Sequence, residues 1–127
     1  MITVKLNNLK VDSTVNRISL ISNINNNVGF EVIGHAMADG YGKDIVCAAV
    51  SAIAQTTAIS LIELVEMKGK KVKIEQRNGF LIFNCLEIEE TQFEKFLTVM
   101  NVFWIGIREI EKLYPDKIKV IEIIENN

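Results

Sequence analysis

Residues 44–66 read DIVCAAVSAIAQTTAISLIELVE, and this stretch decides the fold. Asp44 has the side chain of a helix N-cap, because its carboxylate can accept a hydrogen bond from a backbone N–H two or three residues on. Apolar residues then occur on almost every side of a helix that we expect to reach about Glu66, with Gly69 near the C-cap position. The pattern predicts a central packing helix rather than a surface one.

This stretch is also the one segment long and apolar enough to raise the question of a membrane span. It is interrupted by Gln55, Thr56, Thr57, Ser60 and Glu63. A buried core helix explains it better than a bilayer span. The N-terminus, MITVKLNNLKVD, lacks the apolar block of a signal peptide. We therefore expect a cytoplasmic protein with no membrane partner and with reduced thiols.

Extended segments are expected before the helix. Ile2–Leu6 alternates like a strand, and NNLKVD, residues 7–12, has the composition of a polar turn after it. Val15–Ser22 and Val28–Gly34 follow as two more strands, separated by the turn-prone NINNN. The simplest arrangement of the three strands is an antiparallel hairpin or meander.

A hairpin and a second helix are expected after the first helix. Lys71–Gln76 and Phe80–Ile88 flank an Asn-Gly pair, the strongest short hairpin signal. The second helix begins near residues 89–91 and continues to about Tyr114, and one face of it is apolar. The residues of that face are Phe93, Phe96, Leu97, Met100, Phe103, Trp104, Ile107, Ile110 and Leu113.

The chain ends with one more expected strand, Lys117–Ile124, after Pro115 has stopped the second helix. The order of segments predicts an α+β fold, with a mainly antiparallel sheet of five to six strands and two long helices packed on it. A chain of 127 residues has room for one core, so we expect a single domain over residues 1–127.

Composition excludes several classes of function. The formal net charge is -2, so no strong basic field is available to bind a phosphate backbone, and we expect no nucleic-acid partner. The two cysteines, Cys47 and Cys85, have no partner at CxxC or CxxH spacing. Zinc and iron–sulfur sites are therefore not expected, and we predict no metal and no cofactor.

Cys47 is the first candidate for chemistry. It falls at the third helical position after Asp44, where unsatisfied backbone N–H groups and the helix dipole favour an anion. A thiolate, the form that attacks carbonyl groups, is favoured there, and the same N–H groups can stabilise an oxyanion. Free cysteines are, however, among the most buried residues. Position alone favours packing over reaction.

His35, the only histidine, ends the third strand, from which its ring can reach the start of the helix. Imidazole is the usual base for a cysteine nucleophile, and a solvated strand-end histidine is the alternative. Gly40 and Gly42 lie in the loop between His35 and the helix that carries Cys47. They fit either a mobile loop that covers this pair or an ordinary strand-to-helix connection. The role of helix N-cap is enough to explain Asp44, although its negative charge can also stabilise the imidazolium form of His35.

Two further residues complete the candidates. Ser51 lies one helical turn after Cys47 on the same face, where its hydroxyl lines a site or bonds to a helix carbonyl. Cys85 stands in LIFNCLEI, with no histidine in sequence reach. We therefore interpret Cys85 as a core residue.

Residues 34–53, GHAMADGYGKDIVCAAVSAI, resemble the ribosomal-processing cysteine protease family (Prp, YsxB-like). The family signature is a GHA strand end, a short loop with glycine and a helix start G-x-D-I-V-C-A-A-V-S. Residues 34–36 match the first part, and residues 42 and 44–51 match the second. The resemblance covers both residue identity and the loop length, and a weaker likeness extends to the C-terminus.

The resemblance implies a homodimeric protease that removes a short N-terminal extension from bacterial large-subunit ribosomal protein twenty-seven. It makes Cys47 the nucleophile and His35 the general base and acid, with Gly34, Asp44 and Ser51 as further site residues. Residues 37–43 would form a flexible cover. The implied substrate is an extended peptide that contains aromatic residues.

The chain departs from the family in residues 7–27, which add material that can form an extra strand. Two alternatives to a protease are open. One is a non-catalytic peptide-binding ribosome-assembly factor of the same fold, although such a binder needs neither His35 nor Cys47. The other is a redox-sensing thiol, for which Cys85 offers no evident resolving partner.

Overall fold

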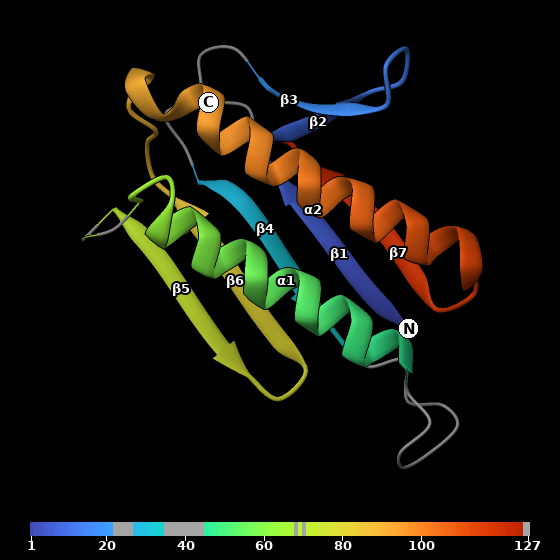
Figure 1. Cartoon of the computed structure of the whole chain (residues 1–127). Helices are drawn as coiled ribbons and strands as arrows, with labels where there is room; N and C mark the ends of the chain where they lie inside the picture. Colours follow the sequence, from blue (N-terminus) through green and yellow to red (C-terminus); the bar gives the residue numbers. More distant parts are fainter. Residues whose placement is uncertain (22–26, 35–44, 68, 70, 126–127) are drawn as a thin grey trace.

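The structure, a computed structural model, describes residues 1–21, 27–34, 45–67, 69 and 71–125. It has an α+β fold, as the sequence predicts (Figure 1). The elements in chain order are β1 (Ile2–Asn7), β2 (Leu9–Asp12), β3 (Arg17–Leu20), β4 (Val28–Ile33), α1 (Ile45–Glu63), β5 (Val72–Arg77), β6 (Phe80–Cys85), the 3₁₀ turn η2 (Glu90–Gln92), α2 (Phe93–Leu113) and β7 (Ile118–Ile123).

The main sheet has five strands in the order β5-β6-β4-β1-β7. Every neighbouring pair is antiparallel except β1 and β7, which are parallel. The expected meander of the first three strands is wrong, because β1 lies between β4 and β7. Its inward side chains Ile2, Val4 and Leu6 are at most 1% exposed, and it pairs with β4 on one side and β7 on the other.

A second, two-stranded sheet is formed by β2 and β3. The polar turn expected at residues 7–12 is therefore wrong: Leu9, fully buried, begins β2. The hairpin packs on α2, where the Asn101 carboxamide accepts from the Ile18 N–H at 2.7 Å and donates to the Ile18 carbonyl at 3.2 Å. The added segment, residues 7–27, thus holds two strands, β2 and β3, which lie outside the main sheet (Figure 1).

The two helices lie side by side over one face of the main sheet (Figure 1). The aromatic rings of Phe30 on β4, Phe83 on β6 and Phe103 on α2 pack together in the core beneath the helices. The ring centroids of Phe30 and Phe103 are 4.5 Å apart. The helices approach closely at Gly106, where a Cβ would lie 2.8 Å from the Ile53 Cδ1. This contact sets the spacing of α1 and α2 and thereby fixes the position of α1 over the sheet.

The helix α1 buries one face only. Val50 and Ala54 are 1% exposed, whereas Ile45 is 60% exposed and Ile59 is 53% exposed. Although apolar residues occur on almost every side of the helix, it is not buried on every side, because the sheet and α2 cover only part of it. In the part of the chain that the structure describes, α1 is long and apolar enough to cross a membrane, a test that the core helix of a soluble protein also passes.

Candidate active site

A cavity of about 400 Å³ lies between α1 and the β5–β6 hairpin. Its volume is within the range of ligand-binding pockets, about 300–1,000 Å³. The described residues that line it are Ile2, Val32, Gly34, Cys47, Val50, Ser51, Ala54, Gln55, Gln76, Arg77, Asn78, Gly79, Phe80 and Leu81. Residues from four separate segments of the chain therefore meet at this one place.

The first half of α1 supplies one wall of the cavity. Cys47, Ser51 and Gln55 follow one another at intervals of four residues and so lie along the same side of the helix. The Cys47 side chain is half-buried and packs against the edge of the core. As the third residue of α1, Cys47 lies in the first turn, whose N–H groups have no partner within the helix.

The floor of the cavity is apolar. Ile2, Val32 and Leu81 come from three adjacent strands of the sheet, and each is at most 8% exposed. Val50 and Ala54 of α1 close the floor on the other side, both 1% exposed. Such a surface binds an apolar side chain, because moving that side chain from water onto the floor is favourable.

Gly34 connects the end of β4 to the hairpin. Its N–H donates to the Gly79 carbonyl at 2.9 Å, so the tight turn of the hairpin is held directly against residue 34. Its φ is +99°, and a Cβ at this position would lie 2.6 Å from the carbonyl oxygen of Met1. Glycine is therefore required on both conformational and steric grounds.

The hairpin supplies the opposite wall and the rim. The Arg77 guanidinium lies 4.7 Å from the centre of the Phe80 ring and 3.3 Å from the Glu75 carboxylate. Arg77 is the one charged residue among the described residues that line the cavity. Gln76 and Asn78 add two carboxamides to the same wall, so the rim is polar above an apolar floor.

The structure brings together three of the residues that the sequence singles out. Gly34, Cys47 and Ser51 all line the cavity, and Ser51 shares the side of α1 that carries Cys47, as predicted. His35, Gly40, Gly42 and Asp44 lie outside the described residues. The roles of all seven residues stay predictions.

Sequence reasoning missed Gln55 on the α1 wall and all the residues of the hairpin wall. Gln55 attracts notice in the sequence only as an interruption of an apolar helix, and the Asn-Gly turn predicts a hairpin without saying what it packs against. The hairpin reaches α1 only through the antiparallel pairing of β6 with β4. No local pattern encodes that pairing.

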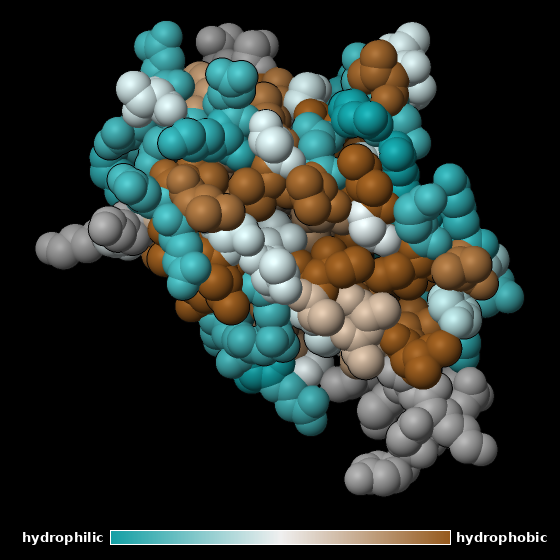
Figure 2. Space-filling view, in the orientation of Figure 1, coloured by the Kyte–Doolittle hydropathy of each residue, from teal (hydrophilic) through white to brown (hydrophobic). Residues whose placement is uncertain are grey.

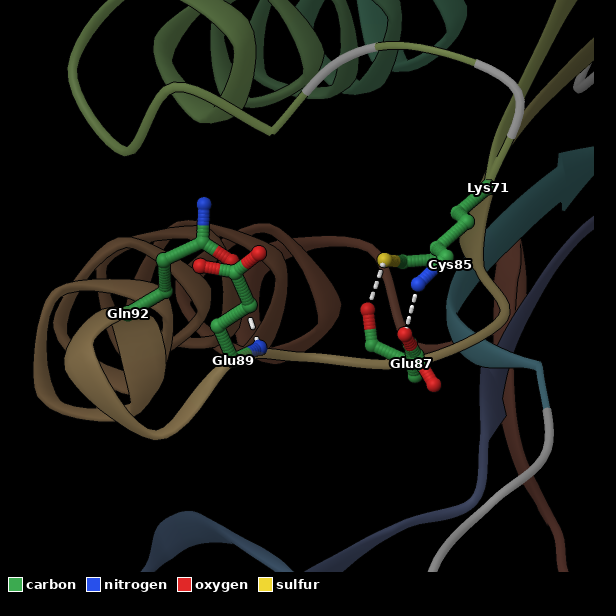
Figure 3. A network of polar contacts seen from close by, with 5 residues as sticks. All are labelled: Lys71, Cys85, Glu87, Glu89 and Gln92. Atoms are coloured by element: carbon green, nitrogen blue, oxygen red, sulfur yellow. Dashed lines mark hydrogen bonds and ion pairs between the residues drawn. The ribbon is translucent and has the colours of Figure 1, made fainter.

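The second cysteine has a very different environment, at the far end of β6 (Figure 3). Cys85 is 3% exposed, and its Sγ–H donates to the Glu87 carbonyl at 2.7 Å. Burial raises the pKa of the Cys85 thiol, although the nearby Lys71 ammonium opposes the rise. Lys71 itself pairs with the Glu87 carboxylate. The prediction that Cys85 is a core residue is confirmed.

The neighbouring cavity at this end is small, about 90 Å³, and is bounded by the loop that leads into α2. In that loop, the Glu89 N–H donates to the Gln92 carboxamide, and the two residues form a capping box at the start of η2 (Figure 3). Neither cysteine forms a disulfide. Within the described ranges, no three His, Cys, Asp or Glu side chains gather in a way that could hold a metal ion.

Comparison with known proteins decides the family. The sequence matches the family model of the cysteine protease Prp over residues 16–119, which is most of the chain. The chain belongs to the Prp family. It is therefore a cysteine protease, an enzyme that hydrolyses peptide bonds. No curated protein matches the sequence closely.

Solved structures share the fold. The ribosomal processing protease Prp from S. aureus, in complex with a covalently linked product peptide, is 20% identical with a TM-score of 0.64, and the match covers 96% of this chain and 99% of that one. A structure of the same protease with a substrate peptide gives 20% identity, a TM-score of 0.63 and the same coverage. SMU.848 from Streptococcus mutans is 22% identical with a TM-score of 0.66, covering 98% of this chain and 96% of that one. At such identities the likeness establishes the fold alone.

Proposed function

We propose that this Prp family member removes a short N-terminal extension from large-subunit ribosomal protein twenty-seven, in the cytoplasm, where ribosomes assemble. Cys47 is the nucleophile in this proposal, and His35 is the general base and acid. The observation that carries the proposal is the position of Cys47, which lies in the first turn of α1 and borders the cavity of about 400 Å³. The S. aureus protease of the same fold is described as a ribosomal processing protease.

The reaction uses the thiolate of Cys47 and two proton transfers. The Cys47 Sγ attacks the scissile carbonyl carbon, and N–H groups of the first turn of α1 stabilise the oxyanion. His35, an imidazolium after taking the Cys47 thiol proton, gives that proton to the leaving amine as the C–N bond breaks, and a thioester remains. Water attacks the thioester while His35 takes one of its protons, and the S–C bond breaks to release the thiolate and a carboxylic acid, which loses its proton to the solvent.

The cavity fits an extended peptide that carries apolar residues. The floor made by Val32, Val50 and Leu81 accepts an apolar side chain, and the polar rim suits the main chain of a peptide. Among the described lining residues none is acidic, so nothing there attracts a basic side chain. An aromatic residue next to the scissile bond is the expected occupant of the floor.

We also propose a homodimer, with the outer face of α1 and α2 between the subunits. Apolar side chains gather on this face (Figure 2). They include Ile45 and Ile59 on α1 and Val102 and Ile105 on α2, all exposed. Light scattering should show a dimer that Val102→Asp converts to a monomer, whereas Leu86→Asp, an exposed leucine outside both helices, leaves the dimer intact.

The cleavage itself is tested with the ribosomal protein as substrate. The purified enzyme is incubated with large-subunit ribosomal protein twenty-seven that carries its extension, and the new N-terminus is read by mass spectrometry. We expect a single cut that removes the extension and that is lost in Cys47→Ala. Cleavage by Cys47→Ala at the native rate would overturn the assignment of the nucleophile. Binding of the extension without any cleavage by the native protein would support the peptide-binding assembly factor instead.

A further inference from the structure

Two carboxamides border the cavity, one from each of its two walls. Gln55 projects from α1, two helical turns after Cys47, and Gln76 projects from β5. Both side chains are exposed, and both border the same cavity as Cys47. Neither has a hydrogen-bond partner among the residues that the structure describes. Their donors and acceptors are available to a ligand in the cavity.

The backbone of Gln76 is available too. The Leu86 N–H donates to the Lys71 carbonyl at 2.7 Å, which makes this opposed pair a hydrogen-bonded one. Hydrogen-bonded and non-hydrogen-bonded pairs alternate along antiparallel strands, so the Gln76–Leu81 pair, five residues from Lys71, is a non-hydrogen-bonded one. The N–H and C=O of Gln76 therefore point away from β6. β5 is one of the two edge strands of the five-stranded sheet, so these groups lie at that edge. Gln76 therefore offers its side chain to the cavity and its backbone to the edge beside it.

We infer that Gln55 and Gln76 bind the main chain of the substrate peptide and hold it across the cavity. This inference deepens the proposed function and rests on it. A carboxamide has both donor and acceptor atoms, as a peptide group does, and it carries no charge that would select a particular side chain. An extended peptide that enters the cavity must replace the water bound to its N–H and C=O groups, and the two carboxamides supply that replacement.

The division of roles within the cavity follows from the chemistry of its surfaces. The apolar floor selects a side chain, and the amide rim binds the backbone whatever the sequence. The scissile carbonyl group is then held near the start of α1, where Cys47 lies. Loss of either carboxamide weakens peptide binding without removing the nucleophile, because neither glutamine belongs to the first turn of α1.

The test measures binding in the absence of turnover. Cys47→Ala is the parent protein, and a fluorescent synthetic peptide with the sequence of the extension is the probe, with affinity read from anisotropy. Adding Gln55→Ala or Gln76→Ala should weaken binding roughly three- to tenfold, the size expected for one hydrogen bond. Thr56→Ala, adjacent on the outer side of α1, and Lys73→Ala, on β5 with its side chain on the other face of the sheet, should change affinity less than about twofold.

A modified probe distinguishes main-chain recognition from side-chain recognition. A series of peptides, each methylated at one backbone nitrogen, should contain a member that loses affinity for the parent but not for the Gln76→Ala variant. Thermal unfolding of every variant confirms that it is folded. Unchanged affinity of both glutamine variants, while the parent binds the peptide, overturns this inference and leaves the proposed function standing. No binding by the parent and no cleavage by the native enzyme overturns both.

Discussion

The β5–β6 hairpin has a cysteine near each end, and the two surroundings differ in almost every respect. At the turn end, Cys47 of α1 is half-buried beside a cavity of about 400 Å³. At the other end, Cys85 of β6 is 3% exposed beside a cavity of about 90 Å³, with its thiol bonded to the Glu87 carbonyl. Of the two cysteines, only Cys47 lies at the start of a helix, is partly exposed and borders a cavity large enough for a ligand.

Residue type alone therefore does not identify a reactive thiol. Burial keeps Cys85 protonated, since it raises the pKa of that thiol, and its hydrogen bond gives it a structural role. Cys47 lies instead where a peptide can reach it and where helix N–H groups are near.

The largest effect is expected from exchanging sulfur for oxygen at each cysteine in turn. Cys47→Ser should lower kcat/KM by about a thousandfold or more, because a hydroxyl is not ionised at neutral pH and a missing nucleophile costs factors of this size. Cys85→Ser should leave kcat/KM nearly unchanged and lower the free energy of unfolding by about 1–2 kcal/mol, as a buried site receives a more polar group. Cleavage kinetics measure kcat/KM, and urea unfolding measures the free energy of unfolding. Loss of activity in Cys85→Ser with full activity in Cys47→Ser would mean that Cys85, not Cys47, is the nucleophile.

A pair of glycines offers the next comparison, one near each end of the hairpin. Gly34 and Gly69 both have a positive φ, +99° and +97°. Alanine at either position costs about 1–2 kcal/mol of backbone strain. Gly34→Ala should cost more than this, because its Cβ would also meet the Met1 carbonyl oxygen at 2.6 Å, whereas no atom of the described residues lies within 4 Å of a Cβ at Gly69.

Activity separates the two glycine variants further. Gly34 precedes His35 and is held against the Gly79 carbonyl, so Gly34→Ala should reduce kcat/KM. Gly69→Ala should leave it unchanged. Equal losses of activity and of unfolding free energy in the two variants would show that the close packing at Gly34 does not matter to the site.

The pH dependence of stability should carry a signature of Cys85. Its pKa is raised in the folded protein, so above about pH 8.5 the unfolded chain loses this proton first. The folded state then holds more protons than the unfolded state, and the free energy of unfolding should fall as pH rises. Thiols ionise between roughly pH 7.5 and pH 10. Over this range, urea unfolding should show that the free energy of unfolding falls more steeply with pH for the native protein than for Cys85→Ala. Identical slopes would contradict the burial argument.

The smallest effect is expected at the Lys71–Glu87 ion pair. Both side chains are more than half exposed, so Lys71→Met should lower the free energy of unfolding by no more than about 1 kcal/mol. The same change removes a positive charge beside Cys85, so it should raise the pKa of that thiol further. Alkylation of Cys85 at high pH should slow accordingly. Faster alkylation would mean that Lys71 acts as a lid over Cys85 rather than through its charge.

Much of the fold was predictable from local patterns. The Asn-Gly pair identified the hairpin, and the apolar spacing of residues 93–113 identified α2, where Phe96, Phe103 and Ile107 are fully buried. The pairing of β1 was not predictable, because strand partners depend on contacts far apart in the sequence. For the same reason β2 was mistaken for a turn, since its pairing with β3 and the burial of Leu9 outweigh a polar local composition.

The candidate site divides in a similar way. Cys47 and Ser51 could be predicted to share one helix face, because their spacing of four residues is a property of any α-helix. Gln55 and Gln76 could not be paired, since one belongs to α1 and the other to β5, and only the sheet order brings β5 to that helix. The contrast between the two thiols likewise became visible only with burial and cavity volume.

The most direct test of the central claim, that Cys47 is the thiol of the protease site, is covalent trapping. A peptide that ends at the expected cleavage point in a chloromethyl ketone is incubated with the native enzyme, and the labelled residue is identified by mass spectrometry of proteolytic fragments. We expect one adduct, on Cys47, with Cys85 unmodified and activity lost in proportion to labelling. An adduct on Cys85, or full inactivation with Cys47 unmodified, would contradict it.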